Sequence, residues 1–185
     1  MELLDIVDEN NNLIGKTEER NIVHEKGLWH RHVGAWIMNE KGEILFQKSA
    51  SCKPENRSKW YKAGGHVDLG ETPLEAIQRE TKEEIGVVIP AENWELISIE
   101  KSTKDDNSNH NFTYSFFTKV NYKIEEYSMQ KEEVADLKYM TIEEMQEKRE
   151  NQDENYTFIY WNDFDKILEI LKEKRKERRK VWEEK

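Results

Sequence analysis

Residues 64–87, GGHVDLGETPLEAIQRETKEEIGV, combine a glycine-rich loop with the pattern of a well-delimited helix. Thr72 is a suitable N-cap, Pro73 falls at the first helical position, and Glu75 completes a Thr-x-x-Glu capping box. Gly86 stands where a helix favours a left-handed terminal residue. The segment therefore predicts a loop, a helix that begins at Pro73, and a stop at Gly86.

The faces of this helix follow from a rotation of about 100° per residue. The residues expected to face the core are Leu74, Ile77, Thr81 and Ile85. Glu80, Glu83 and Glu84 lie three and four residues apart, so they form an acidic patch beside that stripe. Carboxylates this close repel each other unless a cation neutralises them, and oxygen ligands suit a hard ion such as Mg²⁺ or Mn²⁺. Glu71, at the loop end of the helix, is a further candidate ligand.

The alternative to a metal site is an acidic face that is simply solvated, in a chain with 39 acidic residues. That alternative accounts for Glu83 and Glu84 but leaves the glycine loop and the placing of Arg79 and Glu80 unexplained. The sequence therefore favours a metal site on this helix.

The spacing of glycine and charged residues over 65–87 resembles the Nudix box. The matching positions are Gly65, Glu71, Arg79-Glu80, Glu83-Glu84 and Gly86-Val87. The one departure is Thr81, where the family usually has an aliphatic residue; because this position faces the core, the change concerns packing rather than chemistry. The resemblance implies an α/β fold, a Nudix-type α/β/α sandwich with a mixed β-sheet and a long C-terminal helix. We expect residues 1–185 to form one domain, with a charged C-terminal helix at about 162–185.

The resemblance also implies metal-dependent hydrolysis of a diphosphate linkage in a nucleoside diphosphate derivative or a related organic pyrophosphate. Glu83 and Glu84 are the principal expected ligands of Mg²⁺ or Mn²⁺, and Glu80 is either a ligand or the general base. Arg79 would orient a box glutamate through charge-assisted hydrogen bonds. Further expected ligands are the carbonyl of Gly65 and, from a downstream loop, Glu132 or preferably Glu133. The side chains expected to bind substrate are Lys48, Lys59, Lys62 and His66.

The histidines show a second resemblance. The order of His24, His30, the strand through Trp36, and Gly65-His66 is similar to the layout of type 1 isopentenyl-diphosphate isomerase, a Nudix relative. In that enzyme the corresponding histidines bind a metal. A second metal site at His24, His30 and His66 is therefore open, and the alternative is three structural or exposed histidines.

Two other functions are weighed against hydrolysis. The isomerase carries a catalytic cysteine immediately before the Gly-His pair, whereas this chain has Gly64 there, and glycine cannot transfer a proton to an alkene. An isomerase-like enzyme is therefore the less favoured alternative. A Nudix-fold binding module without catalysis is the third, but such a module would be expected to lack metal-binding glutamates, and every box acid is present here.

Composition limits the partners and the compartment. The net charge of -10 argues against broad binding of nucleic acid, which usually needs a basic surface. The single cysteine, Cys52, excludes an internal disulfide framework and fits a reducing cytosol, so we expect a cytoplasmic protein. The first residues lack a basic start and a long apolar run, so no signal peptide and no membrane contact are expected. The resemblance leaves open whether the protein forms a homodimer.

The rest of the chain predicts strands separated by turns, with helices near the end. Strands are expected at 3–7, around 13–15, and at 33–38, 43–47, 94–101, 112–120 and 137–140. Thr141 begins a short helix with its own capping box, and Asn162 caps a final helix. The segments 49–59 and 103–111 are expected to be surface loops that determine specificity. The charged tail 172–180 is either a docking arm or a solvated helix end held by ion pairs.

Overall fold

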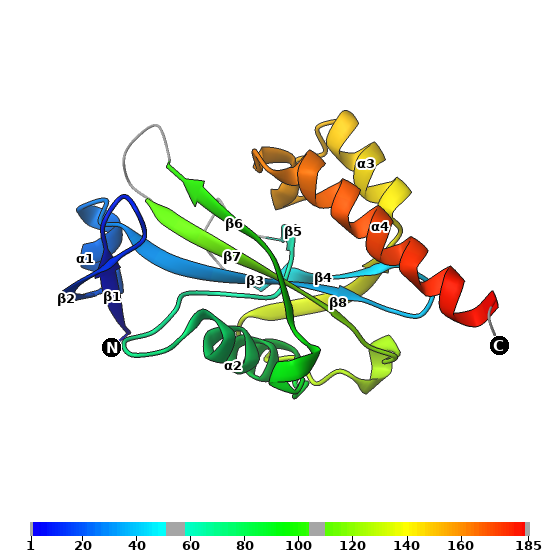
Figure 1. The fold of residues 1–185 in the computed structure, drawn as a ribbon, viewed down its shortest axis with the longest axis horizontal. Helices are drawn as coiled ribbons and strands as arrows, with labels where there is room; N and C mark the ends of the chain where they lie inside the picture. Colours follow the sequence, from blue (N-terminus) through cyan, green and yellow to red (C-terminus); the bar gives the residue numbers. More distant parts are fainter. Residues whose placement is uncertain (1, 51–57, 104–109, 184–185) are drawn as a thin grey trace. The chain divides into compact units, whose positions relative to one another are not determined.

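A computed structural model describes residues 2–50, 58–103 and 110–183 of the chain. It has the α/β fold with a mixed sheet that the sequence predicts (Figure 1). The chain divides into two compact units, Met1–Trp36 with Ala63–Thr118 (unit 1) and Ile37–Lys62 with Lys119–Lys185 (unit 2). That the two units act as a single domain stays a prediction.

Unit 1 contains the glycine loop and the box helix. Its elements are β1 (Leu3–Val7), β2 (Leu13–Glu19), α1 (Arg20–Glu25), most of β3 (His30–Met38), α2 (Pro73–Ile85), η1 (Ala91–Asn93), β6 (Glu95–Ser102) and most of β7 (Asn111–Lys119). The strands β1 and β2 form an antiparallel pair, as do β6 and β7. Strand β7 lies next to β3 and runs in the same direction, which makes the sheet mixed (Figure 1).

Helix α2 begins and ends as its sequence predicts. The Thr72 hydroxyl accepts a hydrogen bond from the Glu75 backbone N–H at 3.3 Å, and the Glu75 carboxylate accepts one from the Thr72 N–H at 2.8 Å. The capping box therefore satisfies two N–H groups at the helix start. Gly86 closes the helix with a φ of 73°, a left-handed conformation that costs glycine little.

The buried face of α2 differs slightly from the predicted stripe. Its buried residues are Ala76, Ile77, Thr81, Glu84 and Ile85. Leu74 is only half-buried, so its assignment to the core was wrong; it lies in the first turn of the helix. Thr81 is fully buried, and its hydroxyl donates to the Ile77 carbonyl at 2.8 Å, which satisfies the polar group inside the core.

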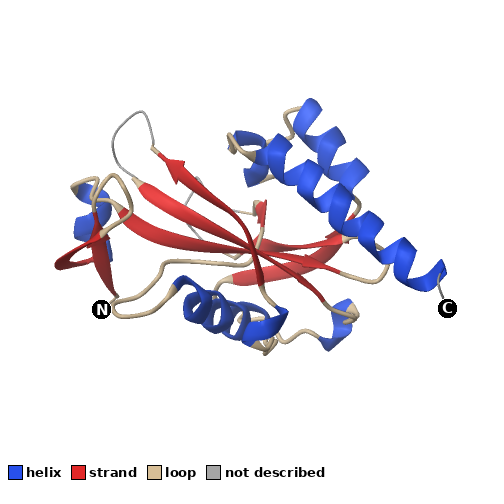
Figure 2. Ribbon diagram, in the orientation of Figure 1, coloured by secondary structure: helices blue, strands red, loops and turns tan. Residues whose placement is uncertain are grey.

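The described part of unit 2 contains three whole strands, the end of a fourth, two α-helices and two short 3-10 helices. Its elements are the end of β3, β4 (Ile44–Ser49), β5 (Trp60–Tyr61), η2 (Ile124–Glu126), β8 (Val134–Met140), α3 (Ile142–Glu150), η3 (Thr157–Tyr160) and α4 (Phe164–Glu183). Strand β4 pairs antiparallel with both β5 and β8. The helices α3 and α4 pack against each other (Figure 2). The Phe158 ring lies 5.4 Å from that of Phe46 and stacks on that of Phe164 at 4.6 Å, which joins the sheet to the last helix.

Most predicted element boundaries hold to within a few residues. The turn after Met38 is a hairpin, as predicted, because Met38 pairs with Ile44. The final helix begins at Phe164, so the residue before it is Asp163, and the predicted cap at Asn162 was one residue early. The larger parts of the two predicted specificity loops, 51–57 and 104–109, lie outside the described residues.

The charged C-terminal helix forms ion pairs where the structure describes its side chains. Arg175 makes a bidentate pair with Glu143 at 2.7 and 2.9 Å, and Lys172 pairs with Glu169 at 2.7 Å. These contacts agree with a solvated helix held by ion pairs. No helix in the described part of the chain has the length and apolar character needed to cross a membrane.

Candidate active site

The glycine loop is fixed to strand β3 by backbone hydrogen bonds. Val33 N–H donates to the Gly65 carbonyl and Ala35 N–H to the Ala63 carbonyl, each at 2.8 Å. These bonds hold the loop against the strand, and only glycine fits the closest approach: a Cβ on Gly64 would lie 2.1 Å from the Val33 carbonyl oxygen. The Gly65 carbonyl, an expected metal ligand, keeps one of its two lone pairs for another partner.

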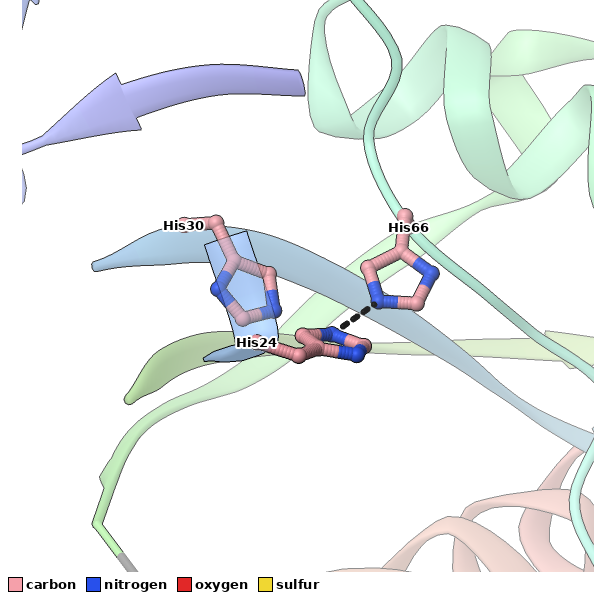
Figure 3. Close-up of side chains that lie close together, drawn as sticks. All are labelled: His24, His30 and His66. Carbon is pink, nitrogen blue, oxygen red and sulfur yellow. Dashed lines mark hydrogen bonds between the residues drawn. The ribbon is translucent and has the colours of Figure 1, made fainter. Parts of the chain in front are cut away.

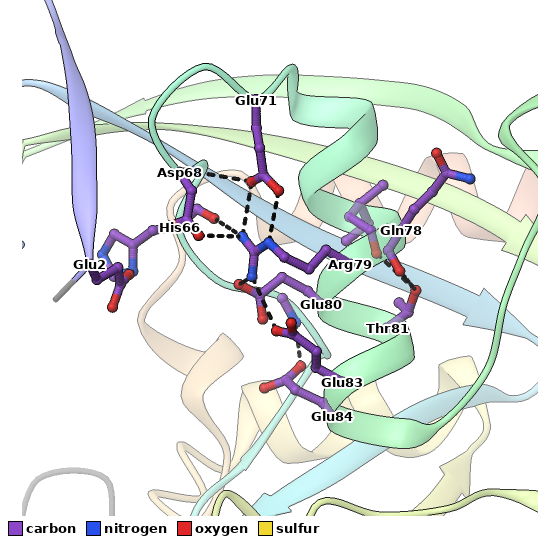
Figure 4. Close-up of polar contacts among 12 residues, drawn as sticks. Glu2, His66, Asp68, Glu71, Gln78, Arg79, Glu80, Thr81, Glu83 and Glu84 are labelled. Carbon is purple, nitrogen blue, oxygen red and sulfur yellow. Dashed lines mark hydrogen bonds and ion pairs between the residues drawn. The ribbon is translucent and has the colours of Figure 1, made fainter.

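Two of the box glutamates lie against this loop. Glu84 is 3% exposed, and its Oε2 accepts a hydrogen bond from the Gly64 backbone N–H at 2.8 Å. Glu80 approaches the next residue so closely that a Cβ on Gly65 would lie 2.2 Å from its Oε1. Figure 4 shows Glu80, Glu83 and Glu84 along one side of α2. The absence of a side chain at Gly65 therefore makes room for Glu80, whereas its absence at Gly64 lets the loop approach the backbone of β3.

Arg79 joins the acidic residues into one network (Figure 4). Its guanidinium binds Glu71 through two hydrogen bonds, at 2.8 and 3.0 Å. The Nη1 atom also donates to Glu80 at 2.9 Å and to Glu83 at 3.2 Å, and Nη2 donates to the His66 carbonyl at 3.0 Å. The hydrogen bonds with Glu71 raise the pKa of Arg79 above its usual value. Arg79 thus contacts three of the box glutamates, and its expected role as an orienting residue stays a prediction.

Glu71 has a different position from the other box acids. Both of its oxygens accept hydrogen bonds from Arg79, and one also accepts the Asp68 N–H at 3.1 Å. Burial is the largest influence on Glu71 and opposes its ionisation, but the hydrogen bonds from Arg79 and the Asp68 N–H, together with the charge of Arg79, outweigh burial and lower the pKa. In this arrangement Glu71 fixes the guanidinium, and its expected role as a metal ligand stays a prediction.

The carboxylates fit a hard divalent cation by their chemistry. Glu80, Glu83 and Glu84 offer only oxygen ligands, and Glu80 lies close to Gly65, whose carbonyl offers a further oxygen. Their side chains range from buried Glu84 to half-exposed Glu83, so a cation bound here would be open to solvent on one side. Arg79 Nη1 now lies between Glu80 and Glu83 and balances their charge. A bound cation would share these two carboxylates with the arginine.

Three histidines form a second cluster in unit 1 (Figure 3). His24 comes from the end of α1, His30 from the start of β3, and His66 from the glycine loop. Each offers one nitrogen, and the three nitrogens lie within 4.8 Å of one another. Within the described ranges, this is the one group of three His, Cys, Asp or Glu residues gathered so closely.

The hydrogen bonds show that one ring nitrogen of His30 has a free lone pair. His30 Nδ1 lies 3.0 Å from the Leu28 carbonyl, which can only accept, so the proton is on Nδ1. His30 Nε2 is buried and has no hydrogen-bond partner among the described residues. Burial lowers the pKa of His30 to about 4, so this ring is neutral near pH 7. His24 Nε2 and His66 Nε2 lie 3.1 Å apart, close to the ~3.3 Å expected for two nitrogens on one tetrahedral zinc-type ion.

Glu2 is a residue that sequence reasoning missed. Its Oε1 lies 3.3 Å from His66 Nδ1, and its other oxygen pairs with Arg20 at 2.9 Å. The hydrogen bond with His66 is the main cause that lowers the pKa of Glu2 to about 2. A carboxylate on the far nitrogen of a histidine fixes the ring and its tautomer. Its position at the start of the chain, far in sequence from the box, gave no pattern that could have revealed it.

Four predicted site residues belong to unit 2 rather than to the unit that holds the box. Glu133 lies just before β8, is exposed, and accepts a long hydrogen bond of 3.5 Å from Gln130. Lys48, Lys59 and Lys62 each lie over an aromatic ring within the same unit. Their expected roles at the metal and the substrate stay predictions.

Replacing Arg79 with lysine should slow turnover while the protein stays folded. Lysine keeps the charge but cannot bind Glu71 in two places and reach Glu80 and Glu83 as well. Each lost charge-assisted hydrogen bond is worth about 1.5–3 kcal/mol, so we expect kcat to fall about ten- to a hundredfold. The concentration of Mg²⁺ for half-maximal activity should rise, because Glu80 and Glu83 lose their alignment. The control is Arg175→Lys, which breaks a bidentate pair in unit 2 and should leave kcat and the Mg²⁺ requirement unchanged. Equal effects of the two variants would contradict the orienting role of Arg79.

The chain is similar in sequence to proteins of a known family. The NUDIX domain model matches residues 28–161. An uncharacterised Nudix hydrolase of Clostridium acetobutylicum is 34% identical over 152 residues, which cover 78% of this chain and 72% of that protein. Nudix hydrolase 3 of Arabidopsis thaliana is 29% identical over 182 residues; the match covers 94% of this chain but only 24% of the plant protein.

The comparison extends to isomerases and to a solved structure. The isopentenyl-diphosphate Delta-isomerase of Serratia proteamaculans is 29% identical over 116 residues, which cover 62% of this chain and 64% of that enzyme. A crystal structure of a protein from Deinococcus radiodurans superimposes with a TM-score of 0.70 at 20% identity, covering 92% of this chain and 99% of that one. The chain therefore belongs to the Nudix hydrolase family, on the branch whose relatives include isopentenyl-diphosphate isomerases.

Proposed function

We propose that the protein uses Mg²⁺ or Mn²⁺ to hydrolyse a diphosphate linkage in a nucleoside diphosphate derivative or a related organic pyrophosphate. The main support is the position of Glu84, a buried carboxylate held by the Gly64 N–H beside Glu80 and Glu83. In the overall reaction a water molecule adds to one phosphorus, the P–O–P bridge breaks, and one proton is released.

Each box residue has a separate task in this proposal. Glu83 and Glu84 hold the cation, which when bound polarises the phosphate oxygens and lowers the pKa of a water ligand. Glu80 is either a further ligand or the base that accepts a proton from the attacking water. Arg79 keeps Glu80 and Glu83 aligned from the side of Glu71. The Gly65 carbonyl supplies its second lone pair to the same cation.

The proposed substrate is a small organic pyrophosphate. We propose that the protein has neither a nucleic acid nor a membrane as a partner. Lys48, Lys59, Lys62 and His66 are the proposed substrate contacts, and Glu133 a proposed additional ligand. A cytoplasmic location and a possible homodimer complete the proposal. The chain offers no catalytic cysteine before Gly65-His66, which is why hydrolysis is preferred over isomerisation although isomerases are among its relatives.

Activity on a panel of pyrophosphates tests the proposal. The panel contains nucleotide sugars, dinucleotides, nucleoside triphosphates and isoprenoid diphosphates, with products identified by mass spectrometry. We expect Mg²⁺-dependent release of phosphate or a nucleotide from at least one compound, and loss of that activity in excess EDTA that returns with added Mg²⁺. Conversion of isopentenyl diphosphate to its isomer would favour the isomerase-like alternative. No turnover of any compound would favour a binding module.

We also propose that His24, His30 and His66 form a second divalent-metal site, as the resemblance to the isomerase implies. The free Nε2 of neutral His30 and the 3.1 Å separation of the other two Nε2 atoms support it. Co²⁺ titration of the apo protein should give visible absorbance bands for one nitrogen-liganded ion. His30→Gln should abolish these bands, whereas Glu84→Gln should keep them. The same spectrum in wild type and His30→Gln would refute the site.

A further inference from the structure

Unit 2 contains a group of lysines and aromatic rings around strand β5. Lys48 lies directly opposite Trp60 across the β4–β5 pair, and Phe46 lies opposite Lys138 across the β4–β8 pair. Phe46 and Lys48 are two residues apart, so their side chains lie on the same face of β4. Cross-strand neighbours share a face as well. Lys48, Lys138 and Trp60 are therefore on one face of three adjacent strands.

The two lysines approach the same ring. Lys138 Nζ lies 4.1 Å from the centroid of Trp60, and Lys48 Nζ lies 5.7 Å from it. Both distances are within the range of cation–π contacts. Lys138 Nζ also lies 2.6 Å from the Tyr156 hydroxyl, to which it donates a hydrogen bond. The position of Lys138 is thus fixed from two sides.

Neither of these two ammonium groups forms an ion pair with a carboxylate in the described part of the chain, although the charge of Lys138 reaches Glu144 and contributes to the lowered pKa of that carboxyl. Asp136 faces Lys48 across the β4–β8 pair, but its Oδ1 accepts a hydrogen bond from the Leu137 backbone N–H at 2.8 Å. Because both lysines contact one ring, their charges lie within about 10 Å of each other, close to the Debye length at about 0.1 M salt, so they repel. Elsewhere in the unit, Lys148 and Lys172 have carboxylate partners at 3.3 and 2.7 Å.

Lys59 and Lys62, the two residues that flank strand β5, also contact aromatic rings. Lys59 Nζ is 5.3 Å from the ring of Tyr160, and Lys62 Nζ is 4.1 Å from the ring of Trp161. Strand β5 and the segment before η3 are joined by a hydrogen bond from Trp60 N–H to the Asn155 carbonyl at 2.7 Å. Tyr160 is 60% exposed, so its ring is available to a planar group in solution.

We propose that Lys48 and Lys138, held over Trp60, form a binding site for a phosphate group, with Tyr160 beside it as a stacking surface for an attached aromatic ring. Lysine ammonium groups bind phosphate as point charges, and an anion between these two removes their mutual repulsion. The site rests on the proposed function and deepens it, because Lys48 is one of the proposed substrate contacts, and all the residues that form the site lie within unit 2. Lys138, Trp60 and Tyr156 are residues that the box pattern does not include.

Titration of the isotopically labelled full chain tests this site directly. The indole N–H signal of Trp60, assigned with Trp60→Phe, reports binding of inorganic phosphate, AMP or adenosine at matched ionic strength. Excess EDTA is present, so that binding through a divalent cation is excluded and turnover does not occur. We expect a saturable shift with phosphate and with AMP, tighter binding of AMP than of phosphate because Tyr160 stacks on the base, and no shift with adenosine.

Variants at the two lysines decide the outcome. Lys48→Gln and Lys138→Gln should each weaken phosphate binding at least fivefold, Lys138→Arg should retain it, and Lys172→Gln should match the wild type. Lys48→Gln breaks no hydrogen bond described for this lysine, so it separates binding from folding. A non-saturable shift, or equal affinities of Lys48→Gln and Lys172→Gln, would overturn the proposal. Because the assay needs neither metal nor hydrolysis, its failure is distinct from a failure of the proposed activity.

Discussion

Glu84→Gln should reduce metal-dependent turnover by two or more orders of magnitude and leave the fold intact. The amide oxygen of glutamine can still accept the hydrogen bond from the Gly64 N–H, so the loop keeps its position. What is lost is the negative charge of a proposed ligand that is 3% exposed. Losing that charge weakens transition-state stabilisation by several kcal/mol, and each ~1.4 kcal/mol corresponds to about tenfold in rate.

The measurement is kcat at saturating Mg²⁺, together with the dependence of the rate on Mg²⁺ concentration and the melting temperature. Glu92→Gln, which removes an exposed carboxylate just after the box, is the matched control and should behave as the wild type. If Glu84→Gln kept more than about a tenth of the wild-type kcat, a loss of under ~1.4 kcal/mol, Glu84 would not be a principal ligand.

The sequence was most informative where one local pattern determines the structure. Thr72, Glu75 and Gly86 have side-chain and backbone preferences that act within a few residues, and all three occupy the predicted cap positions. The period of the helix also placed Glu80, Glu83 and Glu84 on one side. The same period misplaced Leu74, because burial in the first turn depends on what packs there and not on the repeat.

Contacts between distant segments were the part that the sequence could not provide. The order of the histidines suggested a cluster only through a resemblance, and the distances between the rings come from the folding of α1, β3 and the loop. Glu2 has no motif, yet it contacts His66 because β1 runs beside residues 68 and 69. Arg79 was expected to orient one glutamate, and the structure shows that it binds three.

The backbone at Gly64 bears on the choice between hydrolase and isomerase. In the isomerase a cysteine stands at this place, but here the residue has a φ of 145° and lies against the Val33 carbonyl. Any Cβ would collide with that backbone oxygen, which cannot move as a side chain can. A cysteine is therefore incompatible with this loop conformation, and the loop instead directs its N–H toward Glu84. The loop supports the proposed metal chemistry rather than proton transfer.

Gly64→Ala should be the most destabilising of the substitutions considered. A Cβ there would lie 2.1 Å from the Val33 oxygen and 2.8 Å from the Gly34 Cα, at a φ that L-residues rarely adopt. Overpacking and backbone strain each cost about 1–3 kcal/mol, so the free energy of unfolding should fall by roughly 3–5 kcal/mol. Gly70→Ala is the matched control, because Gly70 has a φ of 79° but no atom within 4 Å of the added Cβ. In urea unfolding, Gly70→Ala should lower the free energy of unfolding only by the backbone-strain contribution, about 1–2 kcal/mol. Equal losses in the two variants would mean that the loop is not held against β3 as described.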